Sequence, residues 1–289
     1  NAATPGRYAG TLSGGQAGEH TVTATDGAGL SASADYAVRA GVASALELTA
    51  PATIGASIAF NATLTARDAL GNAADSYTGN VTLTSSDALA ILPAAHKFVA
   101  ADKGVYAFTG VRLASAASQT LTASDGTLSD TTTVDVIAGD AASIAITSAP
   151  TSVVAGQAFS LTIEFRDASG NRAADSDRAL VVSGEGGELR ALTANTAVAI
   201  ISNVVLTEAS AASTITVRAT DLGVEDTTDI AVTPGPASRL TLTGPASAVA
   251  GTAFSVTVSA RDQYDNVAPD YRGVVRFTSN DPSTAPNPI

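Results

Sequence analysis

The stretch Ala66-Arg67-Asp68-Ala69-Leu70-Gly71-Asn72 decides the fold, because it occurs three times in this chain. It returns as Phe165-Arg166-Asp167-Ala168-Ser169-Gly170-Asn171 and again as Ala260-Arg261-Asp262-Gln263-Tyr264-Asp265-Asn266. The arginines of the three copies are 99 and 95 residues apart. Self-similarity at such a fixed period predicts an array of small domains rather than one large enzyme.

Other positions repeat in the same frame. A proline stands nine residues before a phenylalanine in each copy, and a short joint with a glycine precedes each copy: Pro51, Pro150 and Pro245; Phe60, Phe159 and Phe254; Gly41, Gly139 and Gly235. This frame predicts two complete repeats, 41–138 and 139–234. Residues 1–40 match the C-terminal part of a repeat, and residues 235–289 match the N-terminal part.

The two end pieces are complementary parts of one repeat, and two explanations fit this. The chain is a window from a longer repeat protein, in keeping with its first residue not being methionine. Alternatively, the C-terminal piece of one copy is completed by the N-terminal piece of the next, which gives a head-to-tail polymer. The expected partners are therefore neighbouring repeats of the same or an adjacent chain.

The residue pattern within the repeats is that of β-strands. Residues 58–66 alternate apolar and small polar side chains, which is the period-two pattern of a strand with one buried face. Several shorter runs alternate likewise, and glycine, asparagine, aspartate or proline separate them. The sequence predicts an all-β protein of antiparallel β-sandwich domains arranged end to end, with Phe60 and Phe254 pointing into their cores.

The composition argues against two classes of protein, those that bind nucleic acid and those that insert into membranes. The chain has no cysteine, and its net charge is −12 with a pI near 4.4. Such a surface repels phosphate backbones, so we expect no nucleic-acid binding. No apolar run approaches the roughly 20 residues that span a bilayer, so we expect no membrane insertion within this segment.

A catalytic site is not indicated. The two histidines, His20 and His96, fall at non-equivalent positions of different repeats, and neither is part of a recognisable nucleophile–base arrangement. The aspartates and glutamates are spread over turns, where nothing predicts a pocket that raises a pKa. We therefore expect no enzymatic activity and no cofactor other than calcium.

The recurring turn is a candidate calcium site. Oxygen ligands spaced along one turn suit a hard cation. The alternative is that these side chains stabilise the turn by accepting hydrogen bonds from backbone N–H groups. The candidate ligands in the three copies are Asp68, Asn72 and Asp75; Asp167, Asn171 and Asp175; and Asp262, Asn266 and Asp270.

The chain also resembles a known family. The run from Arg67 to Asn72, followed by Tyr77-Thr78-Gly79-Asn80-Val81-Thr82-Leu83-Thr84-Ser85-Ser86-Asp87, is similar to the bacterial immunoglobulin-like repeats of large cell-surface, adhesin-type proteins. The third copy keeps the pattern from Tyr271 to Asp281. The resemblance implies an immunoglobulin-like sandwich, secretion to an extracellular or cell-surface location, a role in a stalk or adhesive fibre, and no catalysis.

Two functions remain open at this point. The first is a structural stalk or filament-forming segment. The second is an adhesin module that binds a glycan or protein through domain-end loops or edge strands. The second repeat departs from the pattern at residues 176–179 and 183–188, which predicts a distorted edge or a loop of special use.

Overall fold

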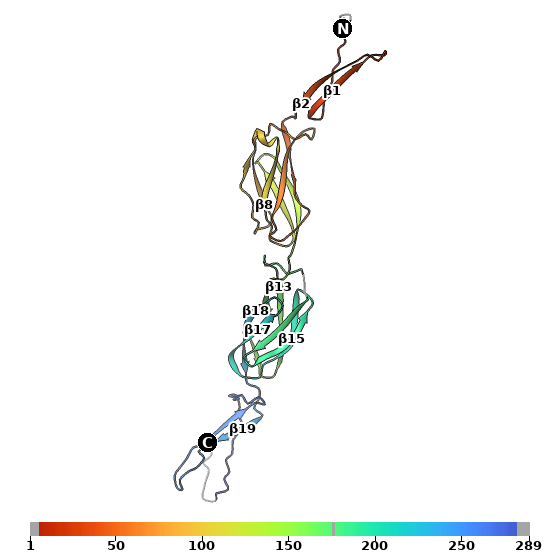
Figure 1. Ribbon diagram of the computed structural model, residues 1–289. Coiled ribbons are helices and arrows are strands. Elements are labelled where there is room, and N and C mark those ends of the chain that lie inside the picture. Colours follow the sequence, from red (N-terminus) through yellow and green to blue (C-terminus); the bar gives the residue numbers. More distant parts are fainter. Residues whose placement is uncertain (1–5, 175–176, 282–289) are drawn as a thin grey trace. The chain divides into compact units, whose positions relative to one another are not determined.

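The computed structural model describes residues 6–174 and 177–281, and in this range the protein is all-β. It contains strands β1 to β20 and a single short 3-10 helix, η1 (Ala100–Asp102) (Figure 1). Within the described residues no helix is long and apolar enough to cross a membrane. The described chain forms two compact units. Ala168–Ala174 belongs to the first unit, with the residues up to Gly139, and Asp140–Asp167 belongs to the second, with the residues that follow the gap.

The first unit contains a two-sheet sandwich. One sheet has the order β3-β5-β8, with β3 at Ala43–Thr49, β5 at Phe60–Asp68 and β8 at Val105–Val111. The other has the order β4-β10-β9-β6-β7, formed by β4 (Thr53–Gly55), β10 (Ser129–Ile137), β9 (Ser118–Ser124), β6 (Asn80–Ser85) and β7 (His96–Lys97). The all-β sandwich expected from the sequence is confirmed.

Alternation of side chains along the strands builds the core of this sandwich. Along β5, Phe60, Ala62, Leu64 and Ala66 are buried between the sheets, and the residues between them are half-buried or exposed. Phe98 and Phe108 fill the space between the sheets, and both are almost fully buried. Burial of such side chains contributes about 1.5–3 kcal/mol each relative to exposure.

Each sandwich also contains one short parallel pairing. Strand β4 runs parallel to β10, and Thr53, Ile54 and Gly55 lie beside Asp135, Val136 and Ile137. Pro51 stands between β3 and β4. Because proline lacks an N–H group and fixes φ, it ends β3 and lets the chain cross to the opposite sheet. Pro150 occupies the same place between β11 and β12 in the second unit.

The second unit contains a sandwich of the same order. Its sheets are β11-β13-β16 and β12-β18-β17-β14-β15. Their bounds are β11 (Ser143–Ser148), β13 (Ala158–Arg166), β16 (Val198–Val205), β12 (Ser152–Val154), β18 (Val224–Thr233), β17 (Ser210–Ala219), β14 (Arg178–Gly184) and β15 (Gly187–Ala194). The edge strand differs between the sandwiches, since β15 has 8 residues and β7 has 2.

The remaining strands form two separate two-stranded sheets. One is the hairpin of β1 (Gly18–Thr25) and β2 (Ser31–Val38), and the other pairs β19 (Arg239–Thr243) with β20 (Thr257–Arg261). The expectation that Phe254 is buried like Phe60 is wrong: Phe60 is 7% exposed, and Phe254 is 57% exposed. Among the described residues, no opposing sheet covers β19 and β20.

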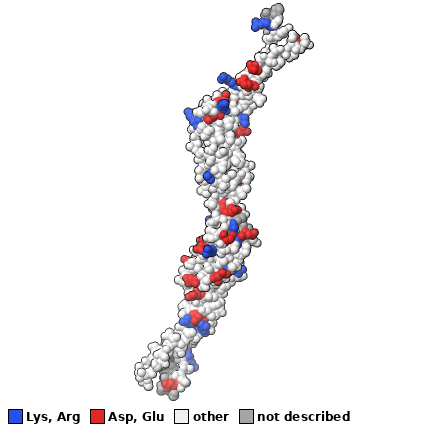
Figure 2. Space-filling model, in the orientation of Figure 1, with Lys and Arg blue, Asp and Glu red and all other residues white. Residues whose placement is uncertain are grey.

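Charged side chains are sparse on the surface. Figure 2 shows a visible face on which acidic and basic residues occur in small mixed groups separated by wide uncharged areas. Small residues such as serine, threonine and alanine occupy many of the exposed strand positions, as in β2. This surface agrees with the low proportion of charged residues, 15%.

Candidate functional site: the repeat junctions

The recurring turn is organised by its aspartate. Asp68 is buried at the end of β5, and its Oδ1 accepts hydrogen bonds from the backbone N–H groups of Leu70 (2.9 Å) and Asn72 (2.8 Å). Its Oδ2 accepts the side-chain amide of Asn72 (3.0 Å) and the backbone N–H of Gly41 (2.8 Å). One carboxylate therefore closes the turn and holds the joint that precedes the repeat.

The third copy repeats these bonds almost atom for atom. Asp262 accepts the backbone N–H groups of Tyr264 and Asn266 on Oδ1, at 2.9 Å each. Its Oδ2 accepts the Asn266 side chain at 2.8 Å and the N–H of Gly235 at 2.9 Å. Asp167 is buried at the equivalent place of the second copy.

The asparagine of the turn binds a different part of the chain. In all three copies its Oδ1 accepts a backbone N–H and its Nδ2 donates to a carbonyl two residues earlier, 55 to 59 residues away in the sequence. We call this pair of bonds the asparagine clasp. The three clasps join Asn72 to Ala17 (2.9 Å) and Gly15 (3.0 Å), Asn171 to Ala116 (2.8 Å) and Ala114 (2.7 Å), and Asn266 to Ala209 (2.8 Å) and Thr207 (2.8 Å).

Each clasped segment lies directly before a strand of the preceding repeat, namely β1, β9 or β17. One of these segments is itself braced. Asp87 is buried, and it accepts hydrogen bonds from the backbone N–H groups of Ala114 (2.6 Å) and Ser115 (3.0 Å). The clasp of Asn171 therefore binds a backbone that is already held in place.

The arginine of the motif supports the turn from outside. The Arg67 guanidinium donates to the carbonyl of Gly71 at 2.8 Å and pairs with Glu47 on the neighbouring strand. In the third copy, Arg261 donates to the carbonyl of Asp265 at 2.6 Å. Gly71 and Asp265 both have left-handed backbone angles, φ 86° and φ 75°. Aspartate tolerates this conformation better than most residues, which explains why it can replace the glycine.

A second contact accompanies two of the clasps. Ser57 and Ser169 share a hydrogen bond of 2.8 Å between their hydroxyl groups. At the corresponding position of the other junction, the ring of Tyr264 lies over Gly156, and a Cβ added to this glycine would come within 2.2 Å of the ring. The two junctions thus pair two small residues in one case, and a glycine with a tyrosine in the other.

The hydrogen bonds determine the acidity of the aspartates. Donation from the Asn72 side chain, followed by the Gly41 N–H, lowers the pKa of Asp68 to about 2. Burial acts to raise the pKa of Asp262, but bonds from Asn266 and Gly235 outweigh it, and the pKa is lowered. Both groups are anionic at neutral pH, which strengthens the N–H bonds that they accept.

The predicted calcium ligands are thus only partly brought together. Asp68 with Asn72, and Asp262 with Asn266, lie side by side, while Asp75 and Asp270 are exposed. Asp175 lies outside the described residues. Within residues 6–174 and 177–281, no three His, Cys, Asp or Glu side chains are grouped closely enough to hold a metal ion. The bonds to backbone N–H groups are those of the alternative interpretation, and calcium binding stays a prediction.

The histidines lie in ordinary surroundings. The His96 ring stacks on Tyr106, with 3.4 Å between ring centroids, and its Nε2 lies 2.9 Å from Asp102 Oδ2. His20 Nε2 lies 2.7 Å from the carbonyl oxygen of Gln16. Neither contact includes a serine, threonine or cysteine that could act as a nucleophile.

The turn is evident from the local sequence, but the clasp is not. The sequence predicts either calcium ligands or side chains that stabilise the turn of their own repeat, whereas the asparagine binds backbone groups 55 to 59 residues earlier. A signal was present: residues 69–71 vary among the three copies, but the asparagine at the end of the turn does not. A turn that only needed to close would tolerate other residues at this position.

No protein-family model matches the chain. No curated protein matches it either. Among solved structures it is similar to the Yersinia pseudotuberculosis adhesin InvE, at 18% identity and a TM-score of 0.33, over 65% of this chain and 58% of that one. The Escherichia coli adhesin FdeC is similar at 20% identity and a TM-score of 0.38, over 70% of this chain and 68% of that one.

The S-layer protein rSbsC(31-844) is also similar, at 15% identity and a TM-score of 0.28, over 91% of this chain and 42% of that one. The chain thus spans little more than half of the InvE structure and less than half of the S-layer structure.

Proposed function

We propose that this chain is a non-catalytic structural segment, a stalk or filament shaft, of a bacterial extracellular or cell-surface repeat protein. The asparagine clasp carries this proposal, because it occurs at all three junctions and links each turn to the preceding repeat. On this proposal the repeats are 41–138 and 139–234, flanked by the parts 1–40 and 235–289. Their partners are neighbouring repeats of the same or an adjacent chain.

The clasp is suited to a mechanical role. Two hydrogen bonds from one planar amide restrict rotation more than a single bond does, and each contributes about 0.5–1.5 kcal/mol net. The residues of the clasp are neutral, so salt does not screen the contact as it screens a surface ion pair. A spacer that must keep its length in a varying environment benefits from such joints.

Replacement of Asn171 by alanine tests the proposal. The variant lacks both bonds to Ala114 and Ala116, so we expect greater freedom at this junction with the sandwich cores unchanged. Small-angle scattering on the monomer fraction should show a broader distribution of maximum dimensions, while circular dichroism stays the same. The matched control is Asn61→Ala, an exposed position on β5. Superimposable scattering curves for wild type and Asn171→Ala would refute the role of the clasp.

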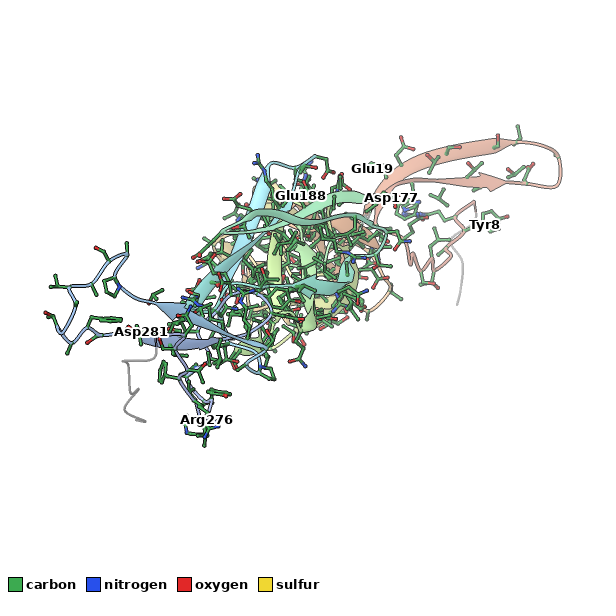
Figure 3. All side chains as sticks on the ribbon, turned by 90° about the horizontal axis from the view of Figure 1, so that it is seen from below. Tyr8, Glu19, Asp177, Glu188, Arg276 and Asp281 are labelled. Carbon is green, nitrogen blue, oxygen red and sulfur yellow. The ribbon has the colours of Figure 1, made fainter. Side chains whose placement is uncertain are left out.

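A second candidate function rests on the edge strand β15. This strand has 8 residues and ends the sheet β12-β18-β17-β14-β15, so one side of its backbone has no partner strand in the described sheet. Such an edge can accept a strand from another protein. Glu188, labelled in Figure 3, lies on β15 and is exposed. Binding on a glycan or host-protein array that Leu192→Pro abolishes would favour an adhesin module over a stalk.

A further inference from the structure

One position of the recurring turn differs in all three copies. The second residue after the aspartate is Leu70, Ser169 or Tyr264, whereas the aspartate and the asparagine never change. Two of these residues contact a turn that lies much earlier in the chain: Ser169 shares a hydrogen bond with Ser57, and the ring of Tyr264 lies over Gly156. Each contact lies within one of the two compact units. A constant clasp therefore stands beside a variable contact.

Ser57 and Gly156 occupy the same place in the two sandwiches. Each lies in the turn that follows the short parallel strand, β4 or β12. The N–H of Ser57 donates to the carbonyl of Leu113 at 2.7 Å, and the N–H of Gly156 donates to the carbonyl of Leu206 at the same distance. Both backbones are left-handed, with φ 60° and φ 83°. The two turns thus have matching backbones and differ in the side chain at this position.

The serine at this position is held in an unfavourable conformation. A left-handed φ is rare for a residue that has a Cβ, whereas glycine adopts it readily. The Ser57 hydroxyl lies 2.8 Å from that of Ser169, which is half-buried. The Ser57 carbonyl accepts a hydrogen bond of 2.6 Å from the Arg112 guanidinium, which holds the turn in place. The side chain that makes the backbone unfavourable is therefore the one that contacts Ser169.

The glycine at the equivalent position is required for a steric reason. A Cβ at Gly156 would lie 2.2 Å from one ring carbon of Tyr264 and 2.3 Å from its hydroxyl oxygen. The backbone of Tyr264 is fixed, because its N–H donates to Asp262 and because Asn266 of the same turn binds Ala209. The ring could avoid such a Cβ only by turning away from position 156, and the contact would then be lost.

The two pairs exclude each other's residues. A tyrosine in place of Ser169 would meet the Cβ of Ser57, because the turn at Ser57 has the backbone conformation of the turn at Gly156. A serine in place of Tyr264 is too short to cover Gly156 as the ring does. Both pairs are uncharged, so the match depends on shape. A steric clash with the wrong partner is an effective source of selectivity.

We propose that this pair of positions determines which repeat can follow which. A repeat with serine at the position of Ser57 accepts a following repeat that has a small hydroxyl residue at the position of Ser169. A repeat with glycine there accepts one that has an aromatic residue, as in the pair of Gly156 and Tyr264. The clasp holds any two neighbours together, and the pair selects between them. This inference rests on the proposed stalk, in which the partners of a repeat are its neighbours in the same or an adjacent chain.

Exchange of the pair within the full chain tests this selectivity. Ser169→Tyr places a ring against Ser57, and Ser57→Gly/Ser169→Tyr transfers the glycine–tyrosine pair to the same turn. The N–H of Ala116, which donates to Asn171 in the clasp, reports the result through its hydrogen exchange. We expect the single variant to speed this exchange about tenfold, since the displaced turn no longer protects the N–H. The double variant should return the exchange rate to that of the wild type.

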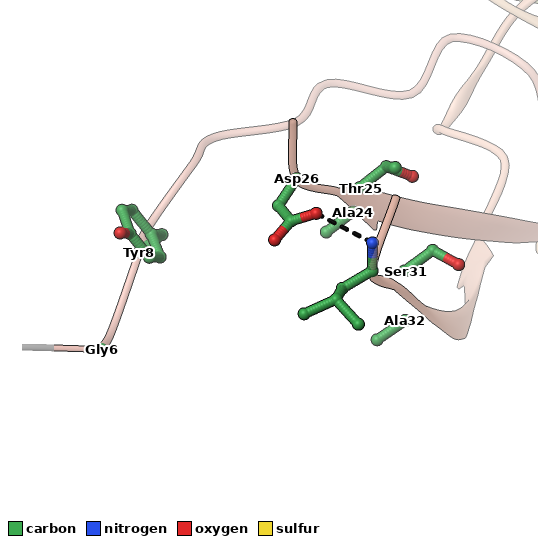
Figure 4. A pocket seen from close by; sticks show the side chains of 8 residues that line it. Gly6, Tyr8, Ala24, Thr25, Asp26, Ser31 and Ala32 are labelled. Atoms are coloured by element: carbon green, nitrogen blue, oxygen red, sulfur yellow. Dashed lines mark hydrogen bonds between the residues drawn. The ribbon is translucent and has the colours of Figure 1, made fainter. Parts of the chain in front are cut away.

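The other pair gives the reciprocal test, and a distant serine gives the control. Gly156→Ser should speed exchange at Ala209, whose N–H donates to Asn266, and Gly156→Ser/Tyr264→Ser should slow it again. The control is Ser31→Tyr, which introduces a ring at an exposed position. Ser31 borders a hollow of about 790 Å³ that has room for a tyrosine (Figure 4). This variant should leave exchange in both clasps unchanged.

The outcomes separate this selectivity from the stalk itself. Wild-type exchange at Ala116 in Ser169→Tyr, or fast exchange that Ser57→Gly does not reverse, would overturn the pairing. If Ser169→Tyr unfolds the chain and the double variant folds again by circular dichroism, the pairing is supported in the same way. Asn171→Ala should speed exchange at Ala116 whatever the pair does. If it does not, the clasp and the proposed stalk fail together, whereas failure of the exchange variants alone leaves the stalk in place.

Discussion

Two polar residues of the same turn bind different parts of the chain. Asp68 accepts hydrogen bonds from its own turn and from the joint at Gly41, while Asn72, four residues later, binds the segment at Gly15 and Ala17. The different partners of the two side chains follow from their hydrogen-bonding groups. A carboxylate only accepts, whereas an amide both donates and accepts and can pair with a backbone N–H and a C=O at once.

Substitution of Gly156 tests whether the Tyr264 ring constrains this junction. It has a left-handed φ of 83°, and a Cβ would lie 2.2 Å from the Tyr264 ring. Gly170 has a similar φ of 85° with no atom within 4 Å of an added Cβ. Alanine at either position should cost about 1–2 kcal/mol for the backbone. We expect Gly156→Ala to cost about 1–3 kcal/mol more because of the clash.

Urea denaturation of these variants measures the two contributions. The extra cost of Gly156→Ala should disappear in a Tyr264→Ala background, where the ring is absent. If the two glycine variants are equally stable with tyrosine present, the ring does not constrain this junction.

The acidity of Asp68 predicts a pH dependence. Its pKa falls from the ordinary 3.8 to about 2 in the folded protein. Because the folded state binds this proton more weakly than the unfolded state, the stabilisation is complete above about pH 4 and is lost as the pH falls toward 2. Asp68→Asn should lower the melting temperature at pH 7, and the difference from wild type should narrow between pH 4 and pH 2.

The control for this measurement is Asp75→Asn. It removes the same charge from an exposed side chain three residues beyond the turn. A gap between Asp68→Asn and wild type that stays constant down to pH 2 would show that the Asp68 carboxylate does not contribute through its charge.

At the scale of the element, a strand acquires its burial from the sheet that faces it. Strand β5 and the residues around β20 have closely similar sequences, and each pairs with an antiparallel strand earlier in the chain, β5 with β3 and β20 with β19. Of these two strands, only β5 is also paired with a third strand, β8, and covered by a second sheet within the described residues. Similar alternation therefore produces a core strand in one place and a largely half-buried strand in the other.

Alanine substitution of two equivalent phenylalanines tests this difference in burial. Phe60→Ala removes a buried ring and should cost about 3–5 kcal/mol. Phe254→Ala changes a side chain that is 57% exposed, so in dilute solution it should cost much less. Thermal melting at low protein concentration checks both variants. Equal losses would mean that Phe254 is covered in solution.

The strand pattern could be predicted from the sequence, because side-chain alternation and proline or glycine positions are local properties. The partner of each strand could not. Nothing around Phe254 distinguishes it from Phe60, since its burial depends on residues far away in the chain. The Asp turn was likewise predictable from local spacing, but the clasp of Asn266 with Thr207 and Ala209 spans 57 to 59 residues. The long edge strand β15 appeared in the sequence only as a departure from the repeat.

Across the whole molecule, the three turns should have the same binding properties, because each contains the same aspartate and asparagine. Any ligand that binds one turn should bind all three. The carboxylate of Asp68 already accepts four N–H bonds, and Asp75 and Asp270 point to solvent, so a cation must compete with the hydrogen bonds that close the turn. This competition predicts calcium affinity no tighter than about millimolar, as in weak extracellular sites.

Calcium titration decides this point for the whole chain. At ten times its dissociation constant, a cation bound only to the folded state adds about 1.4 kcal/mol per site, so the melting temperature should rise with calcium concentration. Magnesium should have a smaller effect, because it requires a nearly octahedral arrangement of oxygen ligands, whereas calcium tolerates an irregular one. The triple variant Asp68→Asn/Asp167→Asn/Asp262→Asn should lose the response. A cation that binds only the folded state must raise the melting temperature. If the wild-type melting temperature does not change with calcium, these aspartates do not bind calcium and act only through their hydrogen bonds.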